Sequence, residues 1–213
     1  VELIDKKTNM LVAGCKNTVI PEDVKIIGEG AFLGLAELTS VTIPYGVTEI
    51  QDCAFWRSGI TSVSLPESVT VIRREAFSEC NNLENITIPK SVKVIEYKAF
   101  SDGAFSEITI PEGVTSIEDW TFMGCNNLKN ISISNSVISI GREAFEGCKN
   151  LLSITIPESV TAIASNAFSN SSLKTIRGYS GSYAETYAKE NGYTFVDLNA
   201  PAVPTVTNVK AVP

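Results

Sequence analysis

The residues of this chain that could perform chemistry are five cysteines, and the chain has no histidine. Cys80, Cys125 and Cys148 occupy one position of a repeated motif, and Cys125 and Cys148 fall on successive copies. We expect these thiols to act as small hydrophobic groups in a core, with a disulfide between Cys125 and Cys148 as the alternative. Without histidine or a Cys-x-x-Cys pair, a structural zinc site is not expected. A Ser-His-Asp triad is excluded.

Carboxylates also fail to form a catalytic pair in the sequence. Glu22, Glu67, Glu112 and Glu158 share one repeat position, but only on alternate copies. No nucleophile, base or metal-binding set converges, so we predict a protein that is not an enzyme and has no cofactor. A glycan-active enzyme using Glu107 or Glu112 is a third hypothesis, behind the two given below.

The best binding candidates are the outward positions of the Leu-x-x-Ile-x-Ile segments, because side chains alternate along a strand. They form two rows of mostly small polar residues, in which we select as tentative binding residues Thr42, Ser64, Asn85, Thr87, Glu107, Thr109, Asn130, Ser132, Thr155 and Arg177. The alternative is that these residues are simply soluble strand formers that pair across strands. Trp120 is expected at an exposed position on the opposite, convex side and is the other candidate contact, whereas Trp56 is expected to be partly packed.

The element that positions these residues is a repeat that begins at an Ile-Pro pair. Its seven copies start at Ile20, Ile43, Leu65, Ile88, Ile110, Ile133 and Ile156, so the steps are 22 or 23 residues. A fixed period of this size predicts a solenoid. We expect a strand at Leu-x-x-Ile-x-Ile, a shorter strand at Ser-Val-Thr-x-Ile, and a single turn of α- or 3₁₀-helix at the Ala-Phe segment between them. The repeated phenylalanine is expected to form a core ladder.

The array requires a cover at each end. Residues 1–19 are predicted to form an N-terminal β-hairpin cap, and residues 20–177 the repeat array. Residues 178–198 are predicted to form a C-terminal cap of a helix and a strand. In that helix Ser182 and Glu185 have the spacing of a capping box. Residues 199–213 read as a linker leading into a further module.

Composition limits the partners. The net charge is −7 and the sequence pI is about 4.8, which disfavours nucleic acid and anionic membrane surfaces. No apolar run approaches the roughly 20 residues of a membrane span. The chain does not begin with Met and shows no signal peptide, so we interpret it as a piece of a longer protein. We expect a monomer.

Several motifs together carry a family resemblance. Leu83-x-x-Ile86-x-Ile88-Pro89, Val92-x-x-Ile95, Ala99-Phe100 and Cys80-Asn-Asn-Leu83 resemble the BspA-like leucine-rich repeats of bacterial and protozoan surface proteins. The segments 5–21 and 181–193 are similar to the opening and closing segments of such arrays. Residues 204–211 resemble the first strand of a fibronectin type III-like module. The departures are small: Ser134 replaces the proline of one copy and Thr121 the alanine of another.

The resemblance implies a leucine-rich-repeat solenoid, mainly β with short helical turns, in a secreted or surface-anchored bacterial protein. For function it implies adhesion, that is, binding of a host or bacterial surface protein or glycan. The alternative is a structural spacer that displays another domain of a longer surface protein.

Overall fold

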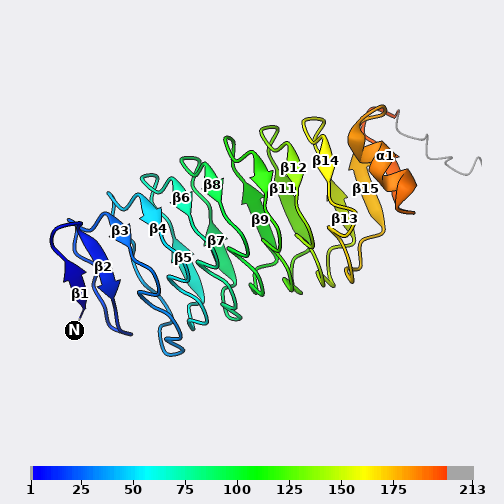
Figure 1. Cartoon of the computed structure of the whole chain (residues 1–213). Coiled ribbons are helices and arrows are strands. Elements are labelled where there is room, and N and C mark those ends of the chain that lie inside the picture. The colour runs from blue at the N-terminus through cyan, green and yellow to red at the C-terminus, as the bar shows by residue number, and fades with distance from the viewer. Residues whose placement is uncertain (1, 201–213) are drawn as a thin grey trace, which may run out of the picture.

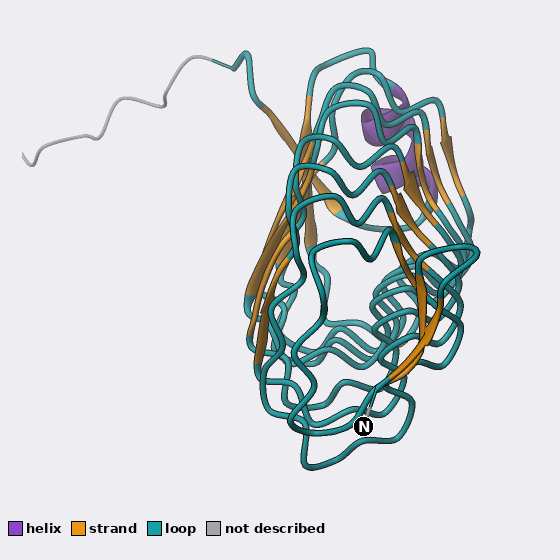
Figure 2. Ribbon diagram, turned by 90° about the vertical axis from the view of Figure 1, so that its left-hand side faces the viewer, coloured by secondary structure: helices purple, strands orange, loops and turns teal. Residues whose placement is uncertain are grey.

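The computed structural model describes residues 2–200 as an elongated stack of coils. Each coil after the first contributes one strand to each of two opposite faces, and loops join the faces at both ends of the flattened cross-section (Figures 1 and 2). In the first coil, Ser40 forms only an isolated bridge with Ser62 on one of these faces. This architecture is the predicted leucine-rich-repeat solenoid, with one coil for each copy of the repeat. The module start expected at residues 204–211 lies outside the described residues.

One face, the long-strand face, is built from the Leu-x-x-Ile-x-Ile segments. Its strands are β5 (Ser62–Ser64), β7 (Asn85–Thr87), β9 (Glu107–Ile110), β11 (Asn130–Ile133), β13 (Ser153–Thr155) and β15 (Thr175–Gly178). Paired strands are parallel and hold equivalent residues in register, as Ile108 pairs with Ile131. The repeat period therefore sets the register.

The opposite face, the short-strand face, is built from the Ser-Val-Thr-x-Ile segments. Its strands are β3 (Ile26–Ile27), β4 (Glu49–Ile50), β6 (Val71–Ile72), β8 (Val94–Ile95), β10 (Ser116–Ile117), β12 (Ser139–Ile140) and β14 (Ala162–Ile163). The predicted N-terminal hairpin is present as β1 (Leu3–Asp5) and β2 (Met10–Ala13), which pair antiparallel. Strand β2 then pairs in parallel with β3 and so covers the first coil.

The Ala-Phe segments are not the helical turns that we expected, but hydrogen-bonded β-turns. In the third copy the amides of Ala76 and Ser78 donate to carbonyls three residues earlier, whereas that of Phe77 donates to Ala99 of the next coil at 2.8 Å. Glu75 and Glu79 have positive φ angles of 54° and 55°, which right-handed helices do not contain. Bonding to the neighbouring coil replaces the hydrogen bonds that a helix would make within itself.

The core of the array is a ladder of stacked phenylalanine rings. It consists of Phe32, Phe55, Phe77, Phe100, Phe122, Phe145 and Phe168, all buried. Neighbouring centroids are 4.9 to 6.0 Å apart, and neighbouring ring planes differ by 4° to 16°. The predicted core position is confirmed.

The repeated cysteines lie beside this ladder as buried thiols, as their main interpretation predicted. The Sγ atom of Cys80 donates to the carbonyl oxygen of Phe55 at 3.0 Å, and those of Cys125 and Cys148 make the same contact with Phe100 and Phe122 at 3.2 Å. All five cysteines lie in the described residues, and no disulfide joins them. The alternative of a Cys125–Cys148 disulfide is therefore not what the structure shows.

The C-terminal end is closed by helix α1 (Tyr183–Glu190) and strand β16 (Thr194–Asp197), which pairs in parallel with β15. Tyr187 on α1 and Tyr193 contact the last ring of the ladder, Phe168, edge-on. The predicted capping box of Ser182 and Glu185 does not form. The Ser182 side chain makes no capping hydrogen bond, and the Glu185 carboxylate accepts from the Gly181 amide at 2.7 Å instead.

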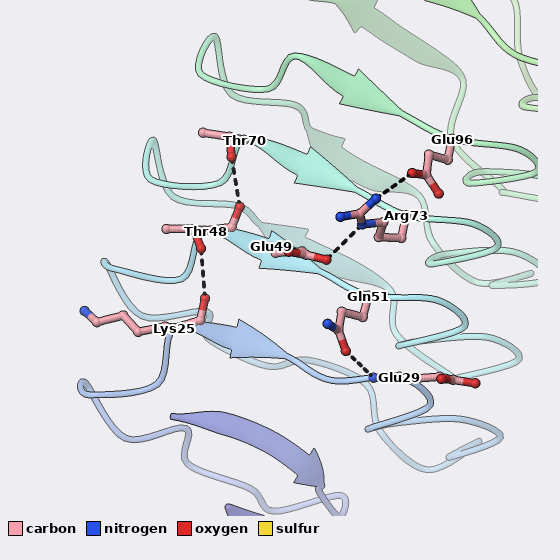
Figure 3. Close-up of polar contacts among 8 residues, drawn as sticks. All are labelled: Lys25, Glu29, Thr48, Glu49, Gln51, Thr70, Arg73 and Glu96. Atoms are coloured by element: carbon pink, nitrogen blue, oxygen red, sulfur yellow. Dashed lines mark hydrogen bonds and ion pairs between the residues drawn. The ribbon is translucent and has the colours of Figure 1, made fainter. Parts of the chain in front are cut away.

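Polar side chains of the short-strand face also join successive coils (Figure 3). Arg73 donates to Glu49 on the preceding coil at 2.8 Å and to Glu96 on the following coil at 2.9 Å. The Thr48 and Thr70 hydroxyls donate to carbonyls of the coils before them. These contacts link the first four coils on the surface of the stack.

Replacing a central rung of the ladder is expected to destabilise the whole array. Phe77→Ala should lower the free energy of unfolding by roughly 3–5 kcal/mol, because burial is lost and a cavity remains between two stacked rings. Urea denaturation followed by circular dichroism measures this change. Tyr45→Ala, at a side chain that is 75% exposed, is the control and should change stability by less than about 0.5 kcal/mol. A loss no larger than that of the control would contradict the ladder's role.

Reactivity toward an alkylating reagent should distinguish the three core cysteines from Cys15. Burial raises the pKa of Cys80 to about 11 and that of Cys148 to about 12, and the thiolate is the reactive form. The hydrogen bond from the Thr18 hydroxyl lowers the pKa of the half-buried Cys15. At pH 8 we therefore expect iodoacetamide to label Cys15 first, and the three core thiols only after urea unfolds the protein. Equal labelling of Cys15 and Cys80 in the folded protein, measured by peptide mass spectrometry, would refute this assignment.

Candidate binding surfaces

The long-strand face carries the two predicted rows of polar side chains. All ten of the tentative binding residues are exposed, while the intervening residues of the same strands, such as Val63 and Ile108, are buried. The strand alternation therefore points these side chains outward as predicted. Their role in binding remains a prediction.

The long-strand face is not one continuous sheet. In the described residues β5 pairs with β7, β9 with β11, β13 with β15, and β15 with β16, which leaves breaks between β7 and β9 and between β11 and β13. The period of the sequence gives no sign of these breaks. They divide the face into three short sheets.

A polar hollow of about 280 Å³ lies across the first break. Its lining includes Thr87, Glu107, Thr109, Asn130 and Ser132, five of the predicted binding residues. The structure thus gathers the central members of both rows around one depression.

Two further hollows extend the same surface toward the loops. One of about 620 Å³ shares Thr87, Ile88, Thr109 and Ser132 with the first and adds an apolar border of Pro89, Ile110, Pro111 and Ile133. The other, of about 440 Å³, is polar and is lined by Glu84, Asn85, Ala104, Ser106, Asn127, Lys129 and Asn150. The apolar border belongs to the repeated Ile-Pro pairs, so the repeat itself was the signal that could have revealed it.

The outer members of the predicted rows are not part of this cluster. Thr42, Ser64, Thr155 and Arg177 line none of these three hollows. Among the carboxylates, Glu107 lies in the polar hollow and Glu112 in the apolar one. The structure therefore places these two carboxylates in different depressions.

Trp120 lies near the short-strand face and is half-buried rather than exposed as expected. Its ring meets Tyr97 edge-on at 5.1 Å, and its Nε1–H donates to Glu143 at 2.6 Å. Trp56 is half-buried, as expected, and its Nε1–H donates to Glu79 at 3.2 Å. Sequence reasoning missed Tyr97, because the aromatic ring appears at this position in one copy only.

Within residues 2–200 no three His, Cys, Asp or Glu side chains gather in a way that could hold a metal ion. In the same residues no helix is long and apolar enough to cross a membrane.

Comparisons with known proteins agree with this architecture. Among curated proteins, no sequence matches this chain. The crystal structure of a leucine-rich cell surface protein from Faecalibacterium prausnitzii is similar, with a TM-score of 0.75 and 34% identity over 83% of this chain and 52% of that one. A leucine-rich repeat protein from Bacteroides ovatus has a TM-score of 0.58 and 25% identity over 79% of this chain and 58% of that one.

This chain thus spans just over half the length of those two proteins. The family model for the BspA type leucine-rich repeat region matches residues 4–129 and 115–190, in six copies. Together these ranges cover the hairpin, the coils and the closing helix. The chain belongs to the BspA-type leucine-rich repeat family.

Proposed function

We propose that this chain is a non-enzymatic binding module of a cell-surface or secreted protein. In this proposal the long-strand face over β7, β9 and β11 receives a host or bacterial surface protein or glycan. The observation that carries the proposal is the clustering of five predicted polar residues around adjoining hollows with an apolar border.

Among these partners, a protein suits the long-strand face best. The polar hollow and the apolar hollow share residues and so form one extended surface. An apolar strip beside hydroxyl, amide and carboxylate groups has the mixture found in protein interfaces, where a desolvated centre is surrounded by a polar rim. A cell-surface location is supported by the relative from Faecalibacterium prausnitzii, which is a cell surface protein.

A structural spacer is the second candidate. It is favoured by the continuous ladder from Phe32 to Phe168, because each coil of such a stack depends on its neighbours along one axis. A spacer would tolerate changes on the long-strand face that leave the ladder intact. The two candidates therefore differ in how they respond to a surface substitution.

Substituting two central threonines tests the binding proposal. The chain is screened for binding to immobilised host matrix proteins, mucins and bacterial surface proteins, and hits are repeated with Thr87→Lys/Thr109→Lys. Both side chains are exposed and line both hollows, so two lysines should weaken binding by at least about tenfold, that is, by about 1.4 kcal/mol or more.

The matched control is Thr161→Lys/Ser165→Lys, which adds the same charge at exposed residues flanking β14 on the other face. It should bind like the unmodified chain, and both variants should keep the same circular dichroism spectrum. Unchanged binding by the Thr87→Lys/Thr109→Lys variant would refute the assignment to this face. Absence of binding to every preparation would favour the spacer.

A further inference from the structure

The short-strand face is interrupted between the fourth and fifth coils. Strand β8 pairs with β6 and β10 with β12, but β8 and β10 do not pair. At every other junction from β2 to β14, a residue just after the strand donates its amide to the preceding coil, as Glu96 does to Ile72 and Gly141 to Ile117. At this junction the equivalent bond from Glu118 to Ile95 is absent, and so is the bond from Thr115 to Lys93.

The interruption coincides with an aromatic wedge in the core. Phe105 stands where other copies have Leu or Ile, and its ring meets Phe100 and Phe122 edge-on at 6.4 and 6.3 Å. The Phe100–Phe122 distance of 6.0 Å is the longest step in the ladder. Gly103 makes room for the wedge, because a Cβ atom there would lie 2.2 Å from the Phe105 ring. We infer that this large side chain holds the two coils apart.

A groove of about 370 Å³ occupies the interruption. This volume lies at the lower end of the range of small-molecule sites, roughly 300–1,000 Å³. Its exposed apolar lining comes from Val94 and the ring of Tyr97, which Trp120 meets edge-on, and the buried Val114 lies beneath them. The Arg74 guanidinium lies 5.2 Å from the centre of the Tyr97 ring and also lines the groove.

The polar groups of the groove both donate and accept hydrogen bonds. The unpaired amides of Thr115 and Glu118 are donors, and the unpaired carbonyls of Lys93 and Ile95 are acceptors. Such backbone groups need water or a ligand as a partner. Among the charged residues of the lining, Arg74 and Lys93 balance Glu96 and Glu118. An anion would meet two carboxylates and a cation two basic groups, so the balance favours an uncharged ligand.

We propose that this groove binds a neutral carbohydrate. A sugar ring has an apolar face of C–H groups that can pack on Tyr97, and hydroxyl groups that donate and accept at the same time. Both properties match the groove. The site lies on the short-strand face and is separate from the surface proposed above for a protein partner.

The test uses an array of neutral oligosaccharides built of hexose and N-acetylhexosamine units, with sulfated and sialylated oligosaccharides beside them. Hits are titrated in the full chain carrying Trp56→Phe, in which Trp120, against Tyr97, is the remaining tryptophan. We expect neutral oligosaccharides to bind and to change the Trp120 fluorescence. Absence of neutral hits, or binding of anionic oligosaccharides alone, would overturn the proposal.

Variants locate the site. Tyr97→Ala should weaken binding by roughly tenfold or more, because the aromatic surface is lost, whereas Tyr97→Phe should retain it. The control Tyr45→Ala removes an exposed ring elsewhere and should have no effect. Binding that survives Tyr97→Ala but is lost in Thr87→Lys/Thr109→Lys would place the sugar on the long-strand face and overturn this assignment.

A second measurement does not depend on a ligand. Phe105→Leu installs the residue that occupies this position in copies with Leu38, Leu83 and Leu128, and should let the two coils approach. Hydrogen exchange at the Thr115 and Glu118 amides should then slow, and sugar binding should fall. Unchanged exchange in a folded Phe105→Leu variant would overturn the role of the wedge in opening the groove.

Discussion

Each coil of this protein can bury its apolar side chains only against the coils before and after it. Inside the array, the stacked phenylalanine rings bury apolar surface between successive coils. Backbone hydrogen bonds also join the coils at both faces and at the Ala-Phe turns. At the Ala-Phe turns, hydrogen bonds between coils replace hydrogen bonds that a helix would make within one coil. Phe77 donates its amide to Ala99 in the next coil, so the segment gives up the internal bonds of a helix in order to extend the stack.

The two terminal coils of the array are covered in different ways. At the N-terminus β2 supplies a parallel partner for β3, while β1 pairs with the other edge of β2. At the C-terminus Tyr187 and Tyr193 contact Phe168, the last ring of the ladder. Aromatic side chains from a helix and its following loop thus complete a core that the repeat can no longer supply.

The surface of the array follows from small irregularities in the repeat. The period of 22 or 23 residues runs through the whole array, yet neighbouring strands fail to pair at some junctions, as β8 and β10 do. At the junction where Phe105 replaces the usual Leu or Ile, the step of the ladder is the longest and the backbone amides of Thr115 and Glu118 lack their usual partners. The hollows on the two faces lie at breaks in strand pairing, one between β8 and β10 and the other between β7 and β9. We therefore expect binding specificity to depend on the residues that differ between copies.

The sequence by itself determined the solenoid, the inward phenylalanine ladder and the outward rows that contain Thr87 and Thr109, because a period of 22 or 23 residues and side-chain alternation are local properties. It also determined that Cys80, Cys125 and Cys148 share one place in the core. Only the tertiary structure decided where the sheets break and which polar residues line a hollow. It also showed that Trp120 is half-buried against Tyr97. Those outcomes depend on the spacing between neighbouring coils, which is set by side chains such as Phe105 packing across copies and not by the pattern within one copy.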